Sequence, residues 1–276
     1  MLDLKPEGHQ FTRLREVVLL PLSLGMQEHV LTAFWNYLLL MEIALKIVRD
    51  ERTYAYRNAE RAKRYNDVVS ASHLTPDSEQ GDFSERLLTL VEGMIERGRN
   101  ITSVAGVEAV AQLVYSRDIR LLDEVLGGYL RSKDGVWLLF DNLDKGWPVN
   151  GSQPADTVVL RSLLEATRKL QRQLERQGVE FHATVFVRND IYEHLLSGTP
   201  DKGKDTATLL DWSDAEAFKE ILRKRIVTST GQGESFDQLW LTYFDTHVRG
   251  EESFSYILAR TLMRPRDLLF NPAISK

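Results

Sequence analysis

Two carboxylates and an amide directly follow a run of apolar residues near the middle of the chain. The run covers residues 136–140, and Asp141, Asn142 and Asp144 come next. A short apolar run bounded by turn residues is typical of a strand buried on both faces of a parallel sheet. Such a strand fixes its terminal acid, which can then hold Mg²⁺ while the metal bridges nucleotide phosphates. We therefore expect Asp141 to bind magnesium, with Asp144 orienting a second ligand or the attacking water.

A second polar group follows the next predicted strand. The segment VEFHATVFVRND, residues 179–190, ends in Arg188, Asn189 and Asp190. The carboxyl ends of parallel strands meet at one edge of a sheet, so a polar group there can sense a γ-phosphate near Asp141. Strand-end Asp residues also occur in ordinary turns, where they accept backbone hydrogen bonds, and this structural alternative stays open.

One segment has the spacing of a phosphate-binding loop. The pattern G-x-x-x-x-G-K occurs over residues 198–204, but Asp205 stands where Ser or Thr would bind magnesium. A phosphate loop works because a strand leads into it and a helix leads out of it. Here a predicted helix at residues 190–196 precedes the pattern, and Pro200 removes one backbone N–H. We interpret the segment as a polar loop that imitates the motif.

A third candidate lies in the predicted N-terminal helices. The segment ERTYAYRNAERAKRY, residues 51–65, interleaves basic residues with three tyrosines. Its basic residues are Arg52, Arg57, Arg61, Lys63 and Arg64. Such a surface can neutralise phosphates and stack on the bases of a nucleic acid. The alternative is a solvated helix face whose tyrosines pack inward.

Composition limits the classes of function. The 40 acidic and 35 basic residues leave a net charge of −5, which gives no overall reason to expect DNA or an anionic membrane as the main partner. The chain has no Cys and six scattered His, so thiolate and His-based metal sites have little support and a cytoplasmic location is expected. The apolar run at residues 30–48 contains Asn36, Glu42 and Lys46. We interpret it as a buried helix of a soluble protein, with no membrane span.

The order of the predicted elements indicates the fold. A short strand at residues 1–6 precedes a long helical region, and two further strands flank an amphipathic helix at residues 157–177 that Gly178 closes. A weaker strand candidate is ATLLDW, residues 207–212, and the rest is expected to form helices. Strands that alternate with helices favour an α/β layer with a parallel sheet, followed by a mostly helical portion.

Two helix starts carry paired capping signals. Asp82 followed by Glu85, and Ser213 followed by Glu216, have the spacing of a capping box. In that motif the two side chains each accept a hydrogen bond from the other residue's backbone N–H. We expect a helix to begin at each pair.

Several segments together resemble those of one protein family. LLFDNLDKGW, VFVRNDIYEHL, LLDWSDAEAFKEILRKRI and RPRDLLF, in this order, are similar to segments of a prokaryotic family of P-loop ATPases related to the STAND and KAP NTPases, found in defence-like signalling contexts. The similarity runs along nearly the whole chain. It implies an α/β fold whose parallel-sheet, P-loop NTPase-like core, residues 1–211, carries a large N-terminal helical insertion at about residues 8–131. Residues 212–276 would form a C-terminal helical lid.

The resemblance also implies roles for single residues, with Mg²⁺ and ATP as the family's cofactors. Asp141 corresponds to the Walker B acid that binds Mg²⁺. Asn142 stands where relatives often carry a second acid, and Asp144 completes the catalytic group. The implied nucleotide-binding residues are the sensors Arg188 and Asn189 and the lid residues Pro265 and Arg266.

One departure from the family concerns the phosphate loop. In relatives the Walker A segment precedes the part that this chain resembles, and Met1 falls where the second strand begins. We therefore expect weak or absent ATP binding and negligible hydrolysis by this chain alone. It would belong to a nucleotide-dependent signalling or defence switch that forms homo-oligomers or controls a protein effector. The alternative is a nucleotide-independent interaction and oligomerisation module, and nucleic-acid binding through residues 51–65 ranks below both.

Overall fold

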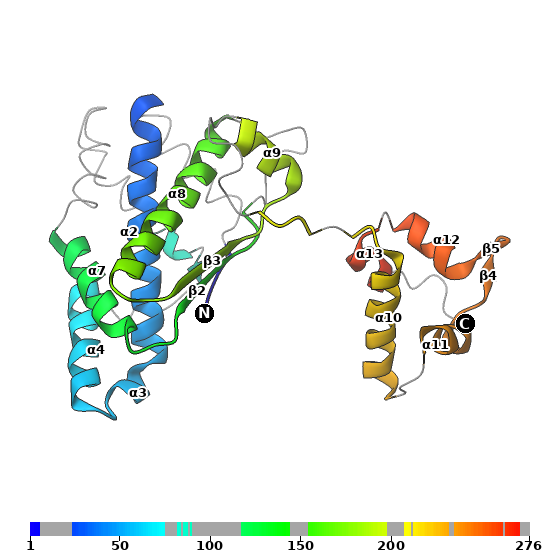
Figure 1. Cartoon of the computed structure of the whole chain (residues 1–276), viewed down its shortest axis with the longest axis horizontal. Coiled ribbons are helices and arrows are strands. Elements are labelled where there is room, and N and C mark those ends of the chain that lie inside the picture. Colours follow the sequence, from blue (N-terminus) through cyan, green and yellow to red (C-terminus); the bar gives the residue numbers. More distant parts are fainter. Residues whose placement is uncertain are drawn as a thin grey trace. The chain divides into compact units, whose positions relative to one another are not determined.

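The computed structural model shows a mostly helical chain with a small parallel sheet (Figure 1). The residues that it describes are 1–5, 24–74, 82–83, 85–87, 89, 117–143, 154–197, 207–210, 212–231, 235–261 and 263–270. They divide into two compact units, residues 1–204 and residues 205–276. The structure thus shows helices and a small parallel sheet. The more specific assignment to a P-loop NTPase core, which the resemblance implies, stays a prediction.

Three parallel strands form the sheet of the first unit. They are β1 (Leu2–Leu4), β2 (Val136–Phe140) and β3 (Phe181–Val185), paired in the order β1-β2-β3. Leu4 lies opposite Phe140, which in turn lies opposite Val185. The carboxyl ends of all three strands therefore share one edge, as the apolar runs of the sequence predicted.

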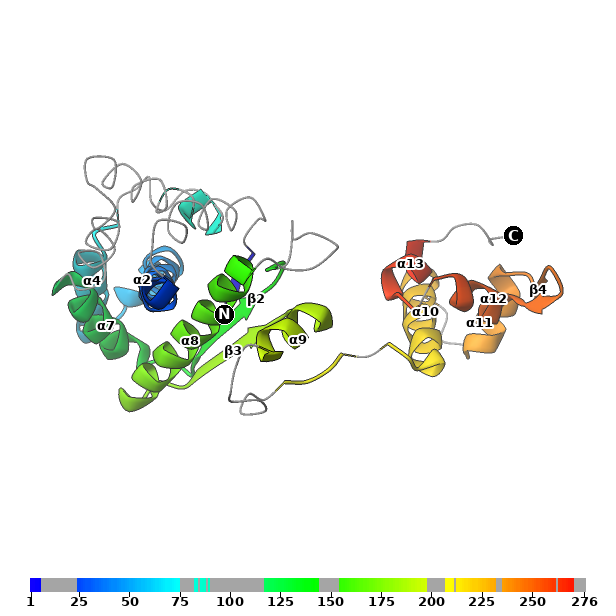
Figure 2. The same cartoon turned by 90° about the horizontal axis from the view of Figure 1, so that it is seen from above.

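The helices of the first unit pack in pairs. They are α2 (Leu24–Asp50), α3 (Arg52–Ala55), α4 (Ala59–Ser72), α7 (Arg117–Leu130), α8 (Pro154–Arg176) and α9 (Asn189–Ser197). Figure 2 shows α2 beside α8 and α4 beside α7. Gly178 follows the end of α8 with φ 76°, a conformation that glycine adopts without steric penalty, so the predicted helix stop is confirmed.

The direction of the chain explains why α2 and α8 lie together. The crossovers from β1 to β2 and from β2 to β3 proceed the same way across the sheet. Because such crossovers are right-handed, both place their helices on the same face. Leu4, Leu138 and Phe140 are buried on this face. On the other face Trp137 stacks on His182 with ring centroids 4.2 Å apart, and Trp137 is 49% exposed.

The apolar helix α2 is the central helix of the core. Its part Gln27–Asp50 is long and apolar enough to cross a membrane, yet 78% of its most apolar window is buried. Glu42 within it is 4% exposed and accepts two hydrogen bonds of 2.6 Å from Arg86. Burial and a paired charge support the interpretation of residues 30–48 as a core helix.

The second unit consists of short helices and a two-stranded hairpin. Its elements are α10 (Ala215–Thr230), α11 (Phe236–Tyr243), β4 (His247–Val248), β5 (Glu251–Glu252), α12 (Ser253–Arg260) and α13 (Pro265–Phe270). Phe218, Trp240, Phe254 and Leu268 form its separate core. The Trp240 indole N–H donates a buried hydrogen bond of 2.8 Å to the Ser253 hydroxyl, which fixes α11 against α12.

The weaker strand prediction at residues 207–212 is wrong. Residues 207–210 and Trp212 have irregular backbone and lie ahead of α10. Leu209 and Leu210 are 70% and 67% exposed, so the apolar residues of this segment are not buried in a sheet. An apolar pair in an exposed connection gives the same sequence pattern as a short strand.

The two predicted capping boxes have different outcomes. The Glu85 N–H donates to the Asp82 carboxylate at 2.9 Å and the Asp82 N–H donates to the Glu85 carboxylate at 3.2 Å, which confirms the first. The second is wrong, because α10 is capped by Asp214 and not by Ser213. Asp214 directly precedes the first helical residue, and its carboxylate accepts from the N–H of Glu216 at 2.9 Å.

Candidate functional site

The carboxyl edge of the sheet is held by hydrogen bonds that continue beyond the strands. The Asp141 N–H donates to the Leu4 carbonyl at 3.2 Å, and the Phe186 N–H donates to the Phe140 carbonyl at 2.9 Å. These bonds fix the backbone of Asp141 at the end of the central strand, next to the end of β1. A buried strand with a neighbour on each side is a rigid support for a carboxylate.

The chain turns sharply directly after Asp141. Asn142 has φ 62°, a left-handed conformation that Asn tolerates better than most residues, and its N–H donates to Asp141 Oδ1 at 2.8 Å. This hydrogen bond is the turn interaction that the structural alternative predicted. It uses one acceptor position of Oδ1, and Oδ2 accepts no hydrogen bond from the residues that the structure describes, so we take Oδ2 as the candidate metal ligand.

Lys5 is a charged neighbour of Asp141 that the sequence analysis missed. Its Nζ lies 2.8 Å from Asp3 Oδ2. This hydrogen bond raises the pKa of Lys5, and the negative charges of Asp3 and, more weakly, Asp141 act in the same direction. The signal was present, because a residue directly after a parallel strand lies at the carboxyl edge, where the residue after the next strand also lies.

The predicted sensor residues interact with α9. Arg188 makes two hydrogen bonds to Asp190, of 3.1 Å and 2.6 Å. Loss of water contact alone would raise the pKa of Asp190, but the hydrogen bonds and charge of Arg188 outweigh it and hold this pKa below its usual value. Asn189, the first residue of α9, donates from Nδ2 to Glu193 Oε1 at 2.8 Å. Both side chains are exposed, and both would have to exchange these contacts for a nucleotide phosphate.

The other predicted site residues lie outside the described residues or in the second unit. Asp144 lies outside the described residues, and so does the phosphate-loop imitation at residues 198–204. Pro265 occupies the first position of α13, where a missing N–H costs no hydrogen bond, and Arg266 after it is exposed. These two residues belong to the second unit, whereas Asp141 belongs to the first.

The carboxyl edge fits one mode of magnesium binding. Within the described ranges, no three His, Asp or Glu side chains converge as ligands of a metal ion. Mg²⁺ is usually held by one or two carboxylates together with water and substrate phosphates, so a complete protein cage is not required. Oδ2 of Asp141 fits this mode, in which the nucleotide itself supplies further ligands.

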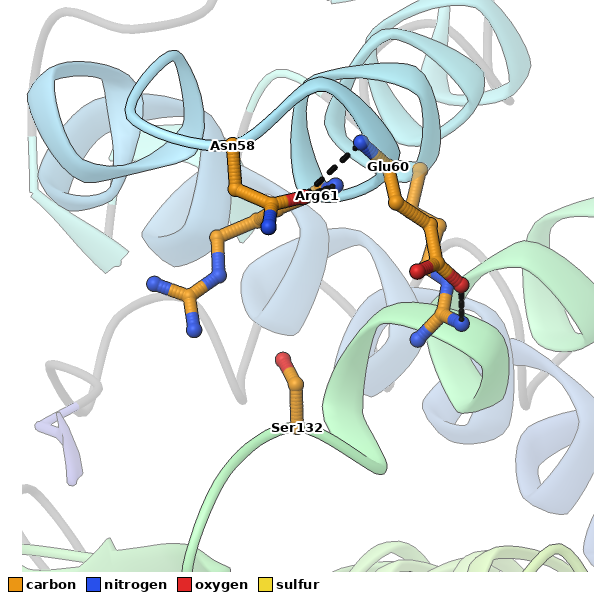
Figure 3. A pocket seen from close by; sticks show the side chains of 5 residues that line it. Asn58, Glu60, Arg61 and Ser132 are labelled. Carbon is orange, nitrogen blue, oxygen red and sulfur yellow. Dashed lines mark hydrogen bonds and ion pairs between the residues drawn. The ribbon is translucent and has the colours of Figure 1, made fainter.

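A second polar site lies between α4 and the turn that follows α7. It is a pocket of about 150 Å³, shown in Figure 3 and lined by Asn58, Glu60, Arg61, Arg64 and Ser132. The structure therefore brings together two of the basic residues that the sequence singled out, Arg61 and Arg64. Arg57 and Lys63 are exposed and do not line the pocket. Ser132 was not predicted, because only the tertiary packing of α7 on α4 brings it there.

Comparison with known proteins gives one finding, and it concerns the second unit. Residues 216–274 match the family described as a FunZ-associated C-terminal helical domain. The matched range contains α11, α12, α13 and nearly all of α10, and the designation points to a defence-related context. The chain matches no curated protein and no solved structure.

Proposed function

We propose that the first unit is the nucleotide-binding α/β part of a cytoplasmic, defence-related signalling switch, and that the second unit is its helical lid. Asp141 would bind Mg²⁺ through Oδ2, and Arg188 or Asn189 would contact the phosphates. The observation that carries the proposal is the position of Asp141 at the carboxyl end of the central strand of a parallel sheet. Ligands of open α/β sheets bind outside that edge.

The remaining charges of this edge suit a phosphate. Lys5 supplies a cation on the β1 side and Arg188 supplies one after β3. Both are paired with neighbouring carboxylates, so a phosphate would replace Asp3 or Asp190 as the partner. Because these exchanges cost hydrogen bonds and Asn142 replaces the second acid of relatives, we expect weak binding and negligible ATP hydrolysis by the chain alone.

The FunZ-associated match supports the defence-related context of the proposal. It places residues 216–274 in a helical domain described as C-terminal. Pro265 and Arg266 lie in that domain, at the start of α13. In the proposed switch, they would be the nucleotide-binding residues of the lid.

The direct test is calorimetric titration of the full chain with Mg-ATP, with Asp141→Ala as the test variant and Asp134→Ala as its control. Asp134 lies at the opposite, amino-terminal end of β2 and is exposed. We expect weak binding that Asp141→Ala abolishes and Asp134→Ala retains. Equal binding by all three proteins would remove Asp141 from the site, and no binding by the unaltered chain would contradict a nucleotide switch operating in this chain.

A second function is favoured by the open face of the sheet. Parallel sheets are normally covered on both faces, yet Trp137 stays 49% exposed on the face opposite α2 and α8. Exposed sheet edges pair with other chains and exposed apolar side chains on a sheet face dock on them, so a nucleotide-independent interaction and oligomerisation module would use this surface. Sedimentation of the full chain and of Trp137→Glu tests it: a homo-oligomer that the substitution dissociates, with no effect of ATP, supports this second function.

A further inference from the structure

The pocket between α4 and the α7–β2 turn presents the guanidinium of Arg61, which makes no hydrogen bond or ion pair with the part of the chain that the structure describes. Among the residues that the structure describes, no hydrogen bond or ion pair involves the side chain of Arg61, although its backbone N–H donates to Asn58 Oδ1 at 3.2 Å. Burial is the main cause that raises the pKa of the neighbouring Tyr129 phenol. The positive charge of Arg61 acts against this rise. Arg61 is therefore a cation at the wall of a pocket whose guanidinium pairs with no carboxylate of the described residues.

Two further groups line the same pocket. Arg64 binds Glu60 Oε1 at 2.5 Å and reaches the carbonyl of Gly128 at 3.4 Å, which leaves other N–H groups of its guanidinium available. The Ser132 hydroxyl donates to the carbonyl of Tyr129 at 2.8 Å and keeps its lone pairs, and Figure 3 shows it pointing towards the space beside Arg61. At about 30 Å³ for each water, the pocket of about 150 Å³ has room for a phosphate group.

Exposed aromatic rings continue the site along α3 and the start of α4. Tyr54 and Tyr56 are 51% and 60% exposed, and the Arg57 guanidinium lies 4.7 Å from the Tyr54 ring. Tyr56 packs edge-on against Tyr65, and the Tyr65 ring lies 6.5 Å from that of Tyr129, whose carbonyl accepts from Ser132. Tyr56 is thus linked to the pocket residue Ser132 through Tyr65 and Tyr129, and Tyr54 precedes the pocket residue Asn58 by four positions in the chain.

From these contacts we propose that the pocket and the tyrosines beside it form a binding site for single-stranded nucleic acid. Arg61 and Arg64 bind backbone phosphates, and the exposed face of Tyr54 stacks on a base. A free phosphate would use the two arginines alone, whereas a single-stranded nucleic acid can also stack a base on the exposed rings. The net charge of the chain is −5, so the attraction is local to this site and not a property of the whole protein. This site is separate from Asp141 and does not depend on the proposed nucleotide site.

The test is fluorescence anisotropy of the full chain with a labelled oligothymidylate of about 12 nucleotides, at about 50 and about 200 mM salt. Affinity falls as salt rises, so the slope of log K against log salt is negative. If two phosphates are bound, Arg61→Gln with Arg64→Gln makes this slope less steep by about 1.4. Arg61→Gln alone removes a side chain with no partner in the described structure, so it weakens binding without a cost in folding. Tyr54→Ala reduces affinity at least about fivefold through lost stacking.

The matched control is Lys169→Gln with Arg176→Gln, which removes the same charge from exposed positions of α8. Retained binding by this control and lost binding by the Arg61 and Arg64 variants supports the site. Equal losses in both double variants would show attraction by net charge only and overturn the proposal. Binding of inorganic phosphate without oligothymidylate, or preference for duplex over single strand, would also overturn it. A uridylate oligomer of the same length shows whether the site distinguishes RNA from DNA, and binding of either supports the proposal.

Discussion

Arg86 donates two hydrogen bonds of 2.6 Å from its guanidinium to the carboxylate of Glu42 in the core of the first unit. The Glu42 side chain is 5% exposed and the Arg86 side chain is 19% exposed. The pair ties the central helix α2 to the helical turn that begins at the capping box of Asp82. A carboxylate is tolerated among apolar residues here because a charged, bidentate partner replaces its water contacts.

Removal of one partner should therefore destabilise the first unit strongly. Arg86→Leu leaves the Glu42 carboxylate buried without its cation, and the expected loss in the free energy of unfolding is about 3–5 kcal/mol. Urea unfolding followed by far-ultraviolet circular dichroism measures this change.

The exposed pair of Arg49 and Asp50 is the natural comparison. The Arg49 side chain is 52% exposed, so Arg49→Leu should change the free energy of unfolding by less than about 1 kcal/mol. Replacing both Glu42 and Arg86 with Leu should recover much of the lost free energy of unfolding, because two apolar side chains can pack together without a buried charge. A similar small effect of Arg86→Leu and Arg49→Leu would show that the Glu42 pair is not effectively buried.

In the second unit, Ser253→Ala should weaken the joint between α11 and α12. The Trp240 N–H donates to Ser253 Oγ at 2.8 Å in a buried position, and without the hydroxyl the indole N–H loses its acceptor. The expected cost is about 1–3 kcal/mol in urea unfolding. Ser229→Ala, an exposed helix position of α10, should stay within about 0.5 kcal/mol of the unaltered chain. Equal effects would contradict the importance of this hydrogen bond.

The sheet could be predicted from the sequence because its strands are short apolar runs that end in polar residues. Asp141 follows such a run, and parallel pairing then brings it to the same edge as the residues after β1 and β3. The same rule could have found Lys5, which directly follows β1. The contacts of Arg188 and Asn189 are local, because Asp190 comes two positions after Arg188 and Glu193 comes four positions after Asn189 on the same helix. The helix predicted at residues 190–196 could therefore have indicated them.

Other features depend on choices that local patterns do not decide. Ser213 and Asp214 are both good N-cap residues, so the sequence does not decide between them, and the structure places Asp214 at the N-cap of α10. The pocket also required the structure: Arg61 and Arg64 are three positions apart on α4, but Ser132 reaches them only because α7 packs along α4.

Asp123 on α7 should make stability depend on pH. Burial raises its pKa, although hydrogen bonds from Gln173 and Gln177 act in the opposite direction. Gln177 Nε2 donates to Oδ2 at 3.0 Å, while Oδ1 is buried without a hydrogen bond in the described structure. An acid whose pKa is raised by folding stabilises the folded state below its unfolded pKa, and this contribution is lost as pH rises through the folded pKa.

Asp123→Asn should remove this loss. The variant gains stability relative to the unaltered chain as pH rises from about 4 to about 7, because a neutral amide carries no desolvation penalty for a charge. Thermal unfolding midpoints across this range measure the gain. Asp134→Asn at an exposed position should show no such gain, and a constant difference between Asp123→Asn and the unaltered chain would disprove the link to pH.

The turn after β2 allows the structural and chemical roles of Asn142 to be separated. Its φ of 62° is available to glycine and costs a β-branched residue about 1–2 kcal/mol. Asn142→Gly should therefore retain stability and keep the N–H that donates to Asp141 Oδ1, whereas Asn142→Val should lower the free energy of unfolding by that amount. If Asn142→Gly also binds Mg-ATP like the unaltered chain, the amide side chain serves the turn alone. Weaker Mg-ATP binding at unchanged stability would instead assign the amide to the nucleotide site, because the backbone that orients Asp141 is the same in both proteins.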